Sequence, residues 1–140
     1  MLRKLAATIS QKPLYSIALF HIVTRGIIFA IHPNLTLFND TEGYTDLAAL
    51  LLNFDLSGYE GYRSPGYPLL LVISGNKLPI AIVLQIVLGI FTSFYLYRML
   101  RFLGFRKASA VFVIFFLNSL FHVIFYEFAI LTESFTLLIA

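Results

Sequence analysis

Long apolar runs separated by short polar segments dominate this sequence. Three runs, 14–31, 78–97 and 108–126, contain few charged residues and are each close to the length of about 20 residues that a bilayer-spanning helix needs. A fourth run begins near residue 132 and reaches Ala140. The pattern therefore predicts an all-α, multi-pass transmembrane protein with three full spans and the start of a fourth. We expect one transmembrane domain over residues 1–140, as the amino-terminal part of a longer membrane module.

The segment 32–77 between the first two spans is more polar and predicts an outer loop. Apolar residues recur there at helical spacing, at Tyr44, Leu47, Ala48, Leu51 and Phe54. With polar residues on the opposite side, this spacing predicts a short amphipathic helix lying in the membrane interface. Asn39, followed three residues later by Glu42, resembles a capping box, so the helix should begin near Asp40.

The same loop ends in the run Arg63-Ser-Pro-Gly-Tyr-Pro68, directly before three leucines. A residue that precedes proline prefers extended backbone, and Pro65-Gly66 suits the centre of a type II turn. Pro68 can then be the first residue of a helix. Tyr67 should lie at headgroup depth, as aromatic residues at membrane interfaces do. The run predicts a stiff return into lipid that holds Arg63 in place.

Composition supports this picture and excludes several classes. Of the 140 residues, 59% are hydrophobic and 12% charged, whereas soluble domains carry about 25% charged residues. The sequence has no cysteine, which excludes disulfides and thiolate metal sites. Its net charge of +3 comes from residues at the ends of apolar runs rather than from a basic face, so we expect no nucleic-acid partner. The first apolar run is too long for a signal peptide and has no A-x-A-like cleavage site, which indicates an uncleaved helix.

Basic residues predict the orientation of the chain. Seven of the ten lie before the first span or between the second and third, at Arg3, Lys4, Lys12, Arg98, Arg101, Arg106 and Lys107. Cytoplasmic loops are enriched in lysine and arginine. We therefore expect a plasma (inner) membrane protein with a cytoplasmic amino terminus and an extracytoplasmic loop 32–77.

Two charged residues near the outer face are candidates for chemistry. Asp40, at the water boundary and flanked by Phe38 and Tyr44, could accept a proton from a hydroxyl as a general base. Alternatively, Asp40 and Glu42 complement the positive end of a helix dipole. Arg25 lies inside the first span, where a charge is costly and is usually kept to pair with another group. Its side chain could bind a phosphate at the outer leaflet or extend into water.

Glu133, at the start of the fourth run, also has a structural and a functional interpretation. It can serve the first turn of a helix capped by Thr132, or act as a second outer carboxylate that binds a metal or a sugar hydroxyl. Glu127 is interpreted as marking the end of the third span, and His21 as a polar group in helix packing. No catalytic triad order, HExxH pair or nucleotide-binding glycine motif is present.

Several of these features occur in a recognisable order: Asp40-x-x-x-Tyr44, then RSPGYPLLL at 63–71, then Leu84-Gln85, then LTES at 131–134. The ordered set resembles the amino-terminal part of the GT-C glycosyltransferases, in particular the family 39-like bacterial relatives of protein O-mannosyltransferases and aminoarabinose transferases. The resemblance implies a membrane enzyme that transfers a sugar from a polyprenyl-phosphate donor to a hydroxyl of a lipid, glycan or protein on the extracytoplasmic face.

The resemblance also implies roles for individual residues. Asp40 would be the catalytic carboxylate, a general base in an inverting transfer. Arg63 and Arg25 would bind the donor phosphate, and Glu133 would take the second acidic position. The predicted substrate-binding set is completed by Tyr44, Glu42 and Tyr67. Some relatives are associated with a divalent metal and others are not, so no cofactor and no metal ligand are assigned.

Members of that family have many more spans, so a chain of this length would lack much of the substrate cavity and would be an inactive piece of the enzyme.

Two other classes of protein remain as alternatives to the transferase. A small non-catalytic membrane subunit that binds polyprenyl phosphate, or that organises a glycan-assembly complex, also fits the sequence. A channel or transporter fits less well, because few polar residues besides Arg25, His21, Gln85 and Asn118 lie deep in the spans.

Overall fold

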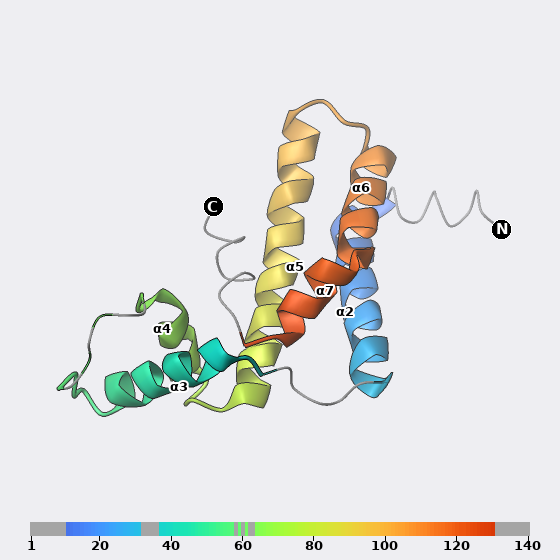
Figure 1. Cartoon of the computed structure of the whole chain (residues 1–140). Coiled ribbons are helices and arrows are strands. Elements are labelled where there is room, and N and C mark those ends of the chain that lie inside the picture. Colours follow the sequence, from blue (N-terminus) through green and yellow to red (C-terminus); the bar gives the residue numbers. More distant parts are fainter. Residues whose placement is uncertain (1–10, 32–36, 58, 60, 62–63, 131–140) are drawn as a thin grey trace. The chain divides into compact units, whose positions relative to one another are not determined.

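A computed structural model describes residues 11–31, 37–57, 59, 61 and 64–130. Six elements lie in these residues and all are α-helices, which confirms the all-α prediction for this part of the chain. The helices are α2 (Pro13–Ile31), α3 (Asn39–Leu52), α4 (Gly66–Ile73), α5 (Leu78–Phe102), α6 (Lys107–Ser119) and α7 (Phe121–Phe128) (Figure 1). The fourth predicted run lies outside the described residues.

The chain divides into two compact units, each built from two separate stretches of sequence. Unit 1 contains Met1–Pro33 and Gly89–Ile124, and unit 2 contains Asn34–Leu88 and Phe125–Ala140. Helices α5 and α7 each contribute residues to both units. Each unit is described below by itself.

Two helices are long and apolar enough to cross a membrane. These are α2, with a mean hydropathy of 1.8, and α5, with 2.1. Helix α2 begins one residue before the predicted start, and α5 continues past the predicted Tyr97 to Phe102. The molecule is therefore a membrane protein by composition and helix length, with two candidate spans in the described residues.

The third predicted span is not one straight helix. It consists of α6 and α7, which are bent by 60° at Leu120 and count as a span only if the pair is taken together. The break follows Asn118 and Ser119, whose side chains donate hydrogen bonds to carbonyl oxygens of the preceding turn at Ile114 and Phe115. Side chains of this kind compete with the helical ladder and bend it. The predicted span over 108–126 is therefore broken, and a third span is neither confirmed nor excluded.

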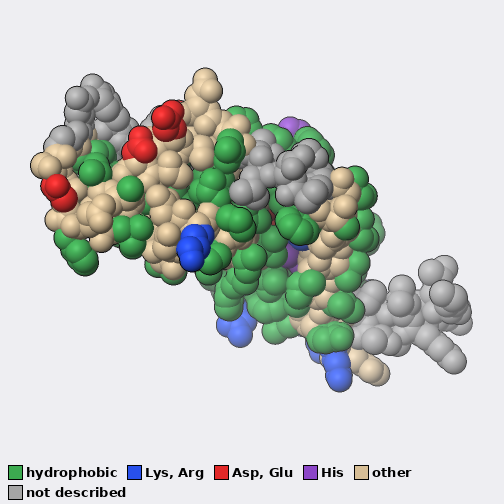
Figure 2. Space-filling view, turned by 90° about the horizontal axis from the view of Figure 1, so that it is seen from below, with side chains coloured by type: hydrophobic (Ala, Val, Ile, Leu, Met, Phe, Trp, Pro, Cys, Tyr) green, Lys and Arg blue, Asp and Glu red, His purple; other side chains and the backbone are tan. Residues whose placement is uncertain are grey.

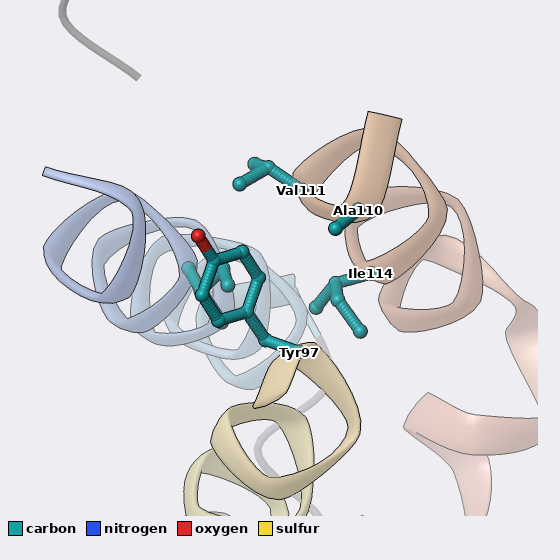
Figure 3. Packing of buried hydrophobic residues seen from close by; sticks show 5 residues of the cluster. Tyr97, Ala110, Val111 and Ile114 are labelled. Atoms are coloured by element: carbon teal, nitrogen blue, oxygen red, sulfur yellow. The ribbon is translucent and has the colours of Figure 1, made fainter. Parts of the chain in front are cut away.

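Packing of apolar side chains joins three helices within unit 1. The buried cluster contains Ile17 of α2, Tyr97 of α5, and Ala110, Val111 and Ile114 of α6. Figure 3 shows the Tyr97 ring between the α2 and α6 ribbons, with Ile114 at its side. Phe20 and Phe115 stack beside this core, with ring centroids 4.2 Å apart.

In unit 2, α3 packs against α4. Helix α3 begins at Asn39, and its first turn is closed by a reciprocal pair at Phe38 and Thr41 rather than at Asn39 and Glu42. The Phe38 backbone N–H donates to Thr41 Oγ1 at 2.9 Å, and the Thr41 N–H donates to the Phe38 carbonyl at 2.9 Å. A threonine hydroxyl two residues into the helix thus takes the position that the sequence pattern gave to Glu42.

Helix α4 begins earlier than the proline pattern predicted. Pro65 is the N-cap, with φ −74° and ψ −8°, and Gly66 is the first helical residue. A type II turn needs ψ near +120° at its first central residue, so the predicted turn at Pro65-Gly66 is absent. Tyr67 is helical although it precedes Pro68, because Pro68 lies in the first turn, where its missing N–H leaves no helical hydrogen bond unmade.

Candidate functional site

The two predicted carboxylates of the outer loop, Asp40 and Glu42, are both exposed in the first turn of α3. Figure 2 shows acidic side chains exposed on the surface of the molecule. Helix N-termini carry a partial positive charge that favours nearby anions. The location is therefore compatible with both readings of Asp40, the general base and the dipole partner.

Tyr44 and Tyr67 lie against each other in unit 2. Their ring centroids are 5.2 Å apart with an interplanar angle of 72°, an edge-to-face contact between α3 and α4. Only 7% of the Tyr44 surface and 1% of the Tyr67 surface are exposed. Tyr67 is thus buried within unit 2, and its predicted position at headgroup depth stays a prediction.

A buried glutamine extends this contact to two further segments of unit 2. The Tyr67 hydroxyl donates to Gln85 Oε1 at 3.3 Å, and Gln85 Nε2 donates to the Ala129 carbonyl at 3.0 Å. The Thr41 hydroxyl also donates to the Ile130 carbonyl at 3.4 Å. Polar contacts therefore connect α4 and α5 to the segment after α7, and they connect α3 to the same segment through Thr41, the residue that follows Asp40.

Arg25 lies in unit 1, buried to 1% exposure within the apolar helices. Its Nη1 donates to the Asn118 carbonyl at 2.8 Å and to Thr24 Oγ1 at 3.0 Å, and its Nη2 donates to Asn118 Oδ1 at 3.3 Å. Because Asn118 lies near the carboxyl end of α6, the arginine binds a carbonyl at the negative end of that helix. Arg25 therefore does not extend into water, and the same burial pairs its guanidinium inside unit 1 rather than with a phosphate at the outer leaflet.

The orientation of the Asn118 amide indicates which ring nitrogen of His21 donates to it. The Asn118 Nδ2 donates to Ser93 Oγ at 3.0 Å and to the Ile114 carbonyl at 2.9 Å, which identifies it as the donor end of the amide. The Oδ1 atom must then accept, so His21 donates to it through Nδ1 at 2.8 Å. His21, Arg25 and Asn118 were predicted from the sequence as deep polar groups, whereas Ser93 was not, because small hydroxyl residues occur in many apolar helices without a polar partner.

The predicted site residues fall into different parts of the chain. Unit 2 contains Asp40, Glu42, Tyr44 and Tyr67, and unit 1 contains Arg25. Arg63 and Glu133 lie outside the described residues, so the predicted contacts of both remain predictions. Glu127 lies in the last turn of α7, as expected for the end of a helix, but is only 4% exposed.

Within the described residues, no group of three or more His, Asp or Glu side chains is placed to hold a metal ion. Comparison of the chain with protein-family models, with curated proteins and with solved structures gives no match. The functional reading therefore depends on the sequence motifs and on the geometry described above.

Proposed function

We propose that the chain is a membrane glycosyltransferase, or the amino-terminal part of one, that transfers a sugar from a polyprenyl-phosphate donor to a hydroxyl acceptor. In this reaction the acceptor oxygen attacks the anomeric carbon of the sugar and the bond from that carbon to the phosphate oxygen breaks. The polyprenyl phosphate leaves with the bonding electrons, and the acceptor proton moves to a carboxylate. We assign the proton acceptor to Asp40.

The observation that carries this proposal is the position of Asp40. It is exposed in the first turn of α3, in the loop that follows the first candidate span, where an acceptor could approach from water and a lipid-linked donor from the membrane. The hydroxyl of the next residue, Thr41, donates to Ile130, which precedes Glu133 by three residues in the sequence. Glu133 lies outside the described residues, and its assignment to the second acidic position rests on the sequence motif.

The phosphate of the donor needs a cation at headgroup depth, and we assign this role to Arg63. A guanidinium donates two parallel hydrogen bonds to phosphate, which both binds the donor and stabilises the charge on the departing group. Pro65, the described residue two positions later, has its φ of −74° fixed by its ring. The buried Tyr44 and Tyr67 contribute by holding α3 against α4 rather than by contacting substrate directly.

Sugar transfer from a labelled polyprenyl-phosphate donor, measured in membranes that contain the intact protein, tests this proposal. Asp40→Asn should lower the rate by about 10²–10⁴-fold, the range for loss of a general base. Asp46→Asn is the matched control, because it removes an exposed carboxylate from the next turn of the same helix. Arg63→Ala should raise the donor concentration needed for half-maximal rate and leave the acceptor dependence unchanged. Equal rates for Asp40→Asn and Asp46→Asn would exclude Asp40 as the base.

A further inference from the structure

Three of the helices end in the same hydrogen-bonded motif. In a Schellman motif, the residue after the C-cap adopts left-handed backbone, and two N–H groups bind the last carbonyls of the helix. Helix α4 ends this way at Gly75 (φ 64°), with N–H bonds from Gly75 to Val72 and from Asn76 to Leu71. Helix α5 ends this way at Gly104 (φ 89°), with bonds from Gly104 to Arg101 and from Phe105 to Leu100.

Helix α3 ends in the same motif with an aromatic residue in the glycine position. Phe54 has φ 53°, its N–H donates to Leu51 at 3.2 Å, and the N–H of Asp55 donates to Leu50 at 3.1 Å. Left-handed backbone is unfavourable for a residue with a Cβ, and a bulky residue there is an outlier. The strain has no internal compensation, because 98% of the Phe54 surface is exposed.

A large apolar side chain that is both strained and exposed indicates a partner outside the chain. Next to Phe54 is a cavity of about 370 Å³ that is lined by apolar side chains of Leu51, Leu52, Phe54, Leu56, Leu69 and Val72. A second cavity, of about 280 Å³, adjoins Leu69 and is lined mainly by Leu70 and Ile73 of α4 and by Leu84, Val87 and Leu88 of α5. Leu69 lines both cavities, so the two form one apolar surface within unit 2.

This surface continues the face of a candidate membrane span. Leu84, Val87 and Leu88 belong to α5, the described helix with the higher mean hydropathy of the two candidate spans, 2.1. The exposed side chains of a spanning helix contact the acyl chains of lipids. Since Leu69 lines both cavities, one of which reaches Phe54 and the other α5, one kind of partner suffices for both.

We propose that the end of α3 is a membrane anchor, in which Phe54 and the Leu69 surface bind the acyl chains of bilayer phospholipids. The adjacent carboxylate of Asp55 is exposed and would be repelled by anionic headgroups, so the anchor fits a zwitterionic lipid. Transfer of the Phe54 ring from water to acyl chains offsets the strain of its backbone. This interaction is independent of the proposed transferase activity, because it uses neither Asp40 nor Arg63.

The absence of tryptophan from the sequence allows a direct test. In Phe54→Trp the introduced indole is the single tryptophan of the chain, and its emission reports its surroundings after reconstitution in phosphatidylcholine vesicles. Asp46→Trp, an exposed position among the polar residues of α3, is the water-facing control, and Val83→Trp, 58% exposed on α5, is the lipid-facing control. The same variants are then measured in vesicles of phosphatidylcholine brominated on its acyl chains, which quenches an indole on contact.

We expect Phe54→Trp to emit at shorter wavelength than Asp46→Trp and to be quenched by the brominated lipid to an extent similar to Val83→Trp. Emission as red as that of Asp46→Trp would overturn the proposal. Blue-shifted emission without quenching would overturn it as well, because the ring would then be covered by protein, such as a second copy of the chain. If Phe54→Trp fails to insert, Leu69→Trp, which lies where the two cavities meet, is judged by the same criteria.

Discussion

Replacement of Asn118 by leucine should test whether the buried polar cluster of unit 1 stabilises the protein. Leucine has a similar size, so the change removes hydrogen bonds with little change in volume. Three contacts of the amide are lost to other helices: Oδ1 with His21 and with Arg25, and Nδ2 with Ser93. The bond from Arg25 to the Asn118 backbone carbonyl does not need the amide and should persist.

The expected loss of stability follows from these three contacts. Side-chain hydrogen bonds between membrane helices average about 0.6 kcal/mol each in double-mutant cycles, which gives about 2 kcal/mol for the set. Stripping a buried polar group of its partner costs about 1–3 kcal/mol in water-soluble proteins. The arginine adds to the loss because hydrogen bonds to charged groups are the stronger ones. We therefore expect the free energy of unfolding of Asn118→Leu to fall by about 2–4 kcal/mol. The lower value comes from the membrane hydrogen-bond average and the upper value adds the cost of leaving buried polar groups unpaired.

Unfolding by sodium dodecyl sulfate, followed by far-ultraviolet circular dichroism in mixed micelles, measures this free energy. Ser119→Ala is the matched control, because the exposed hydroxyl of the neighbouring residue donates only within α6, to Phe115. Its stability should change by less than about 0.5 kcal/mol, as is usual for exposed substitutions. A second change, Ser93→Ala, should cost less in the Asn118→Leu background than in the parent, because the partner is already gone. Equal stability of Asn118→Leu and the parent would refute a stabilising role of the cluster.

Two further predictions concern unit 2 and helix α2. Gly75→Ala should lower the free energy of unfolding by about 1–2 kcal/mol, because its φ of 64° disfavours any side chain although no atom lies within 4 Å of the added Cβ. Gly26 has equally open surroundings but helical backbone, so Gly26→Ala should raise the free energy of unfolding by about 0.5–1 kcal/mol. If both substitutions changed the free energy of unfolding in the same direction, the backbone explanation would be contradicted. The side chain and the backbone N–H of Ser57 donate to Asp55 and hold its pKa below the ordinary value of 3.8. The contact therefore stabilises the folded protein fully above pH 3.8. This stabilisation is lost as the pH falls through the lowered pKa of Asp55. Ser57→Ala should move the Asp55 pKa, measured by nuclear magnetic resonance titration, back toward 3.8, and an unchanged pKa would show that the hydroxyl is not involved.

Apolar run lengths predicted the helices of this chain better than they predicted its breaks. Runs of apolar residues determine where a spanning helix is possible, and both α2 and α5 lie where the pattern placed them. The break at Leu120 was not predictable from hydropathy, because both of the helices that flank it, α6 and α7, are rich in apolar residues. A signal was present in Asn118-Ser119, two side chains that bond to their own helix, but the same pair occurs in unbroken helices.

The start of α3 agrees with the prediction near Asp40, but the closure of its first turn differs from the predicted pattern. The pair Asn39 and Glu42 has the spacing of a capping box, yet Thr41 closes the first turn. Thr41 also donates to Ile130, a residue 89 positions later, and this distant acceptor is not visible in the local pattern. Similarly, the bond from the Tyr67 hydroxyl to Gln85, 18 positions later, is not visible in the local pattern around Tyr67. The exposed Asp40 could be predicted, because exposure at a helix start needs only local information.

The two buried polar clusters explain how such an apolar chain selects particular helix contacts. Lipid tails are as apolar as leucine side chains, so burial of an apolar face against another helix rather than against lipid gains little. Each cluster instead has one side-chain amide at its centre, Asn118 in unit 1 and Gln85 in unit 2, and each amide bonds other segments through its oxygen and its nitrogen. A rotation of α6 or α5 that kept the apolar surface buried would still break these bonds. The amides therefore restrict the helices to one rotational setting, which hydropathy alone leaves open.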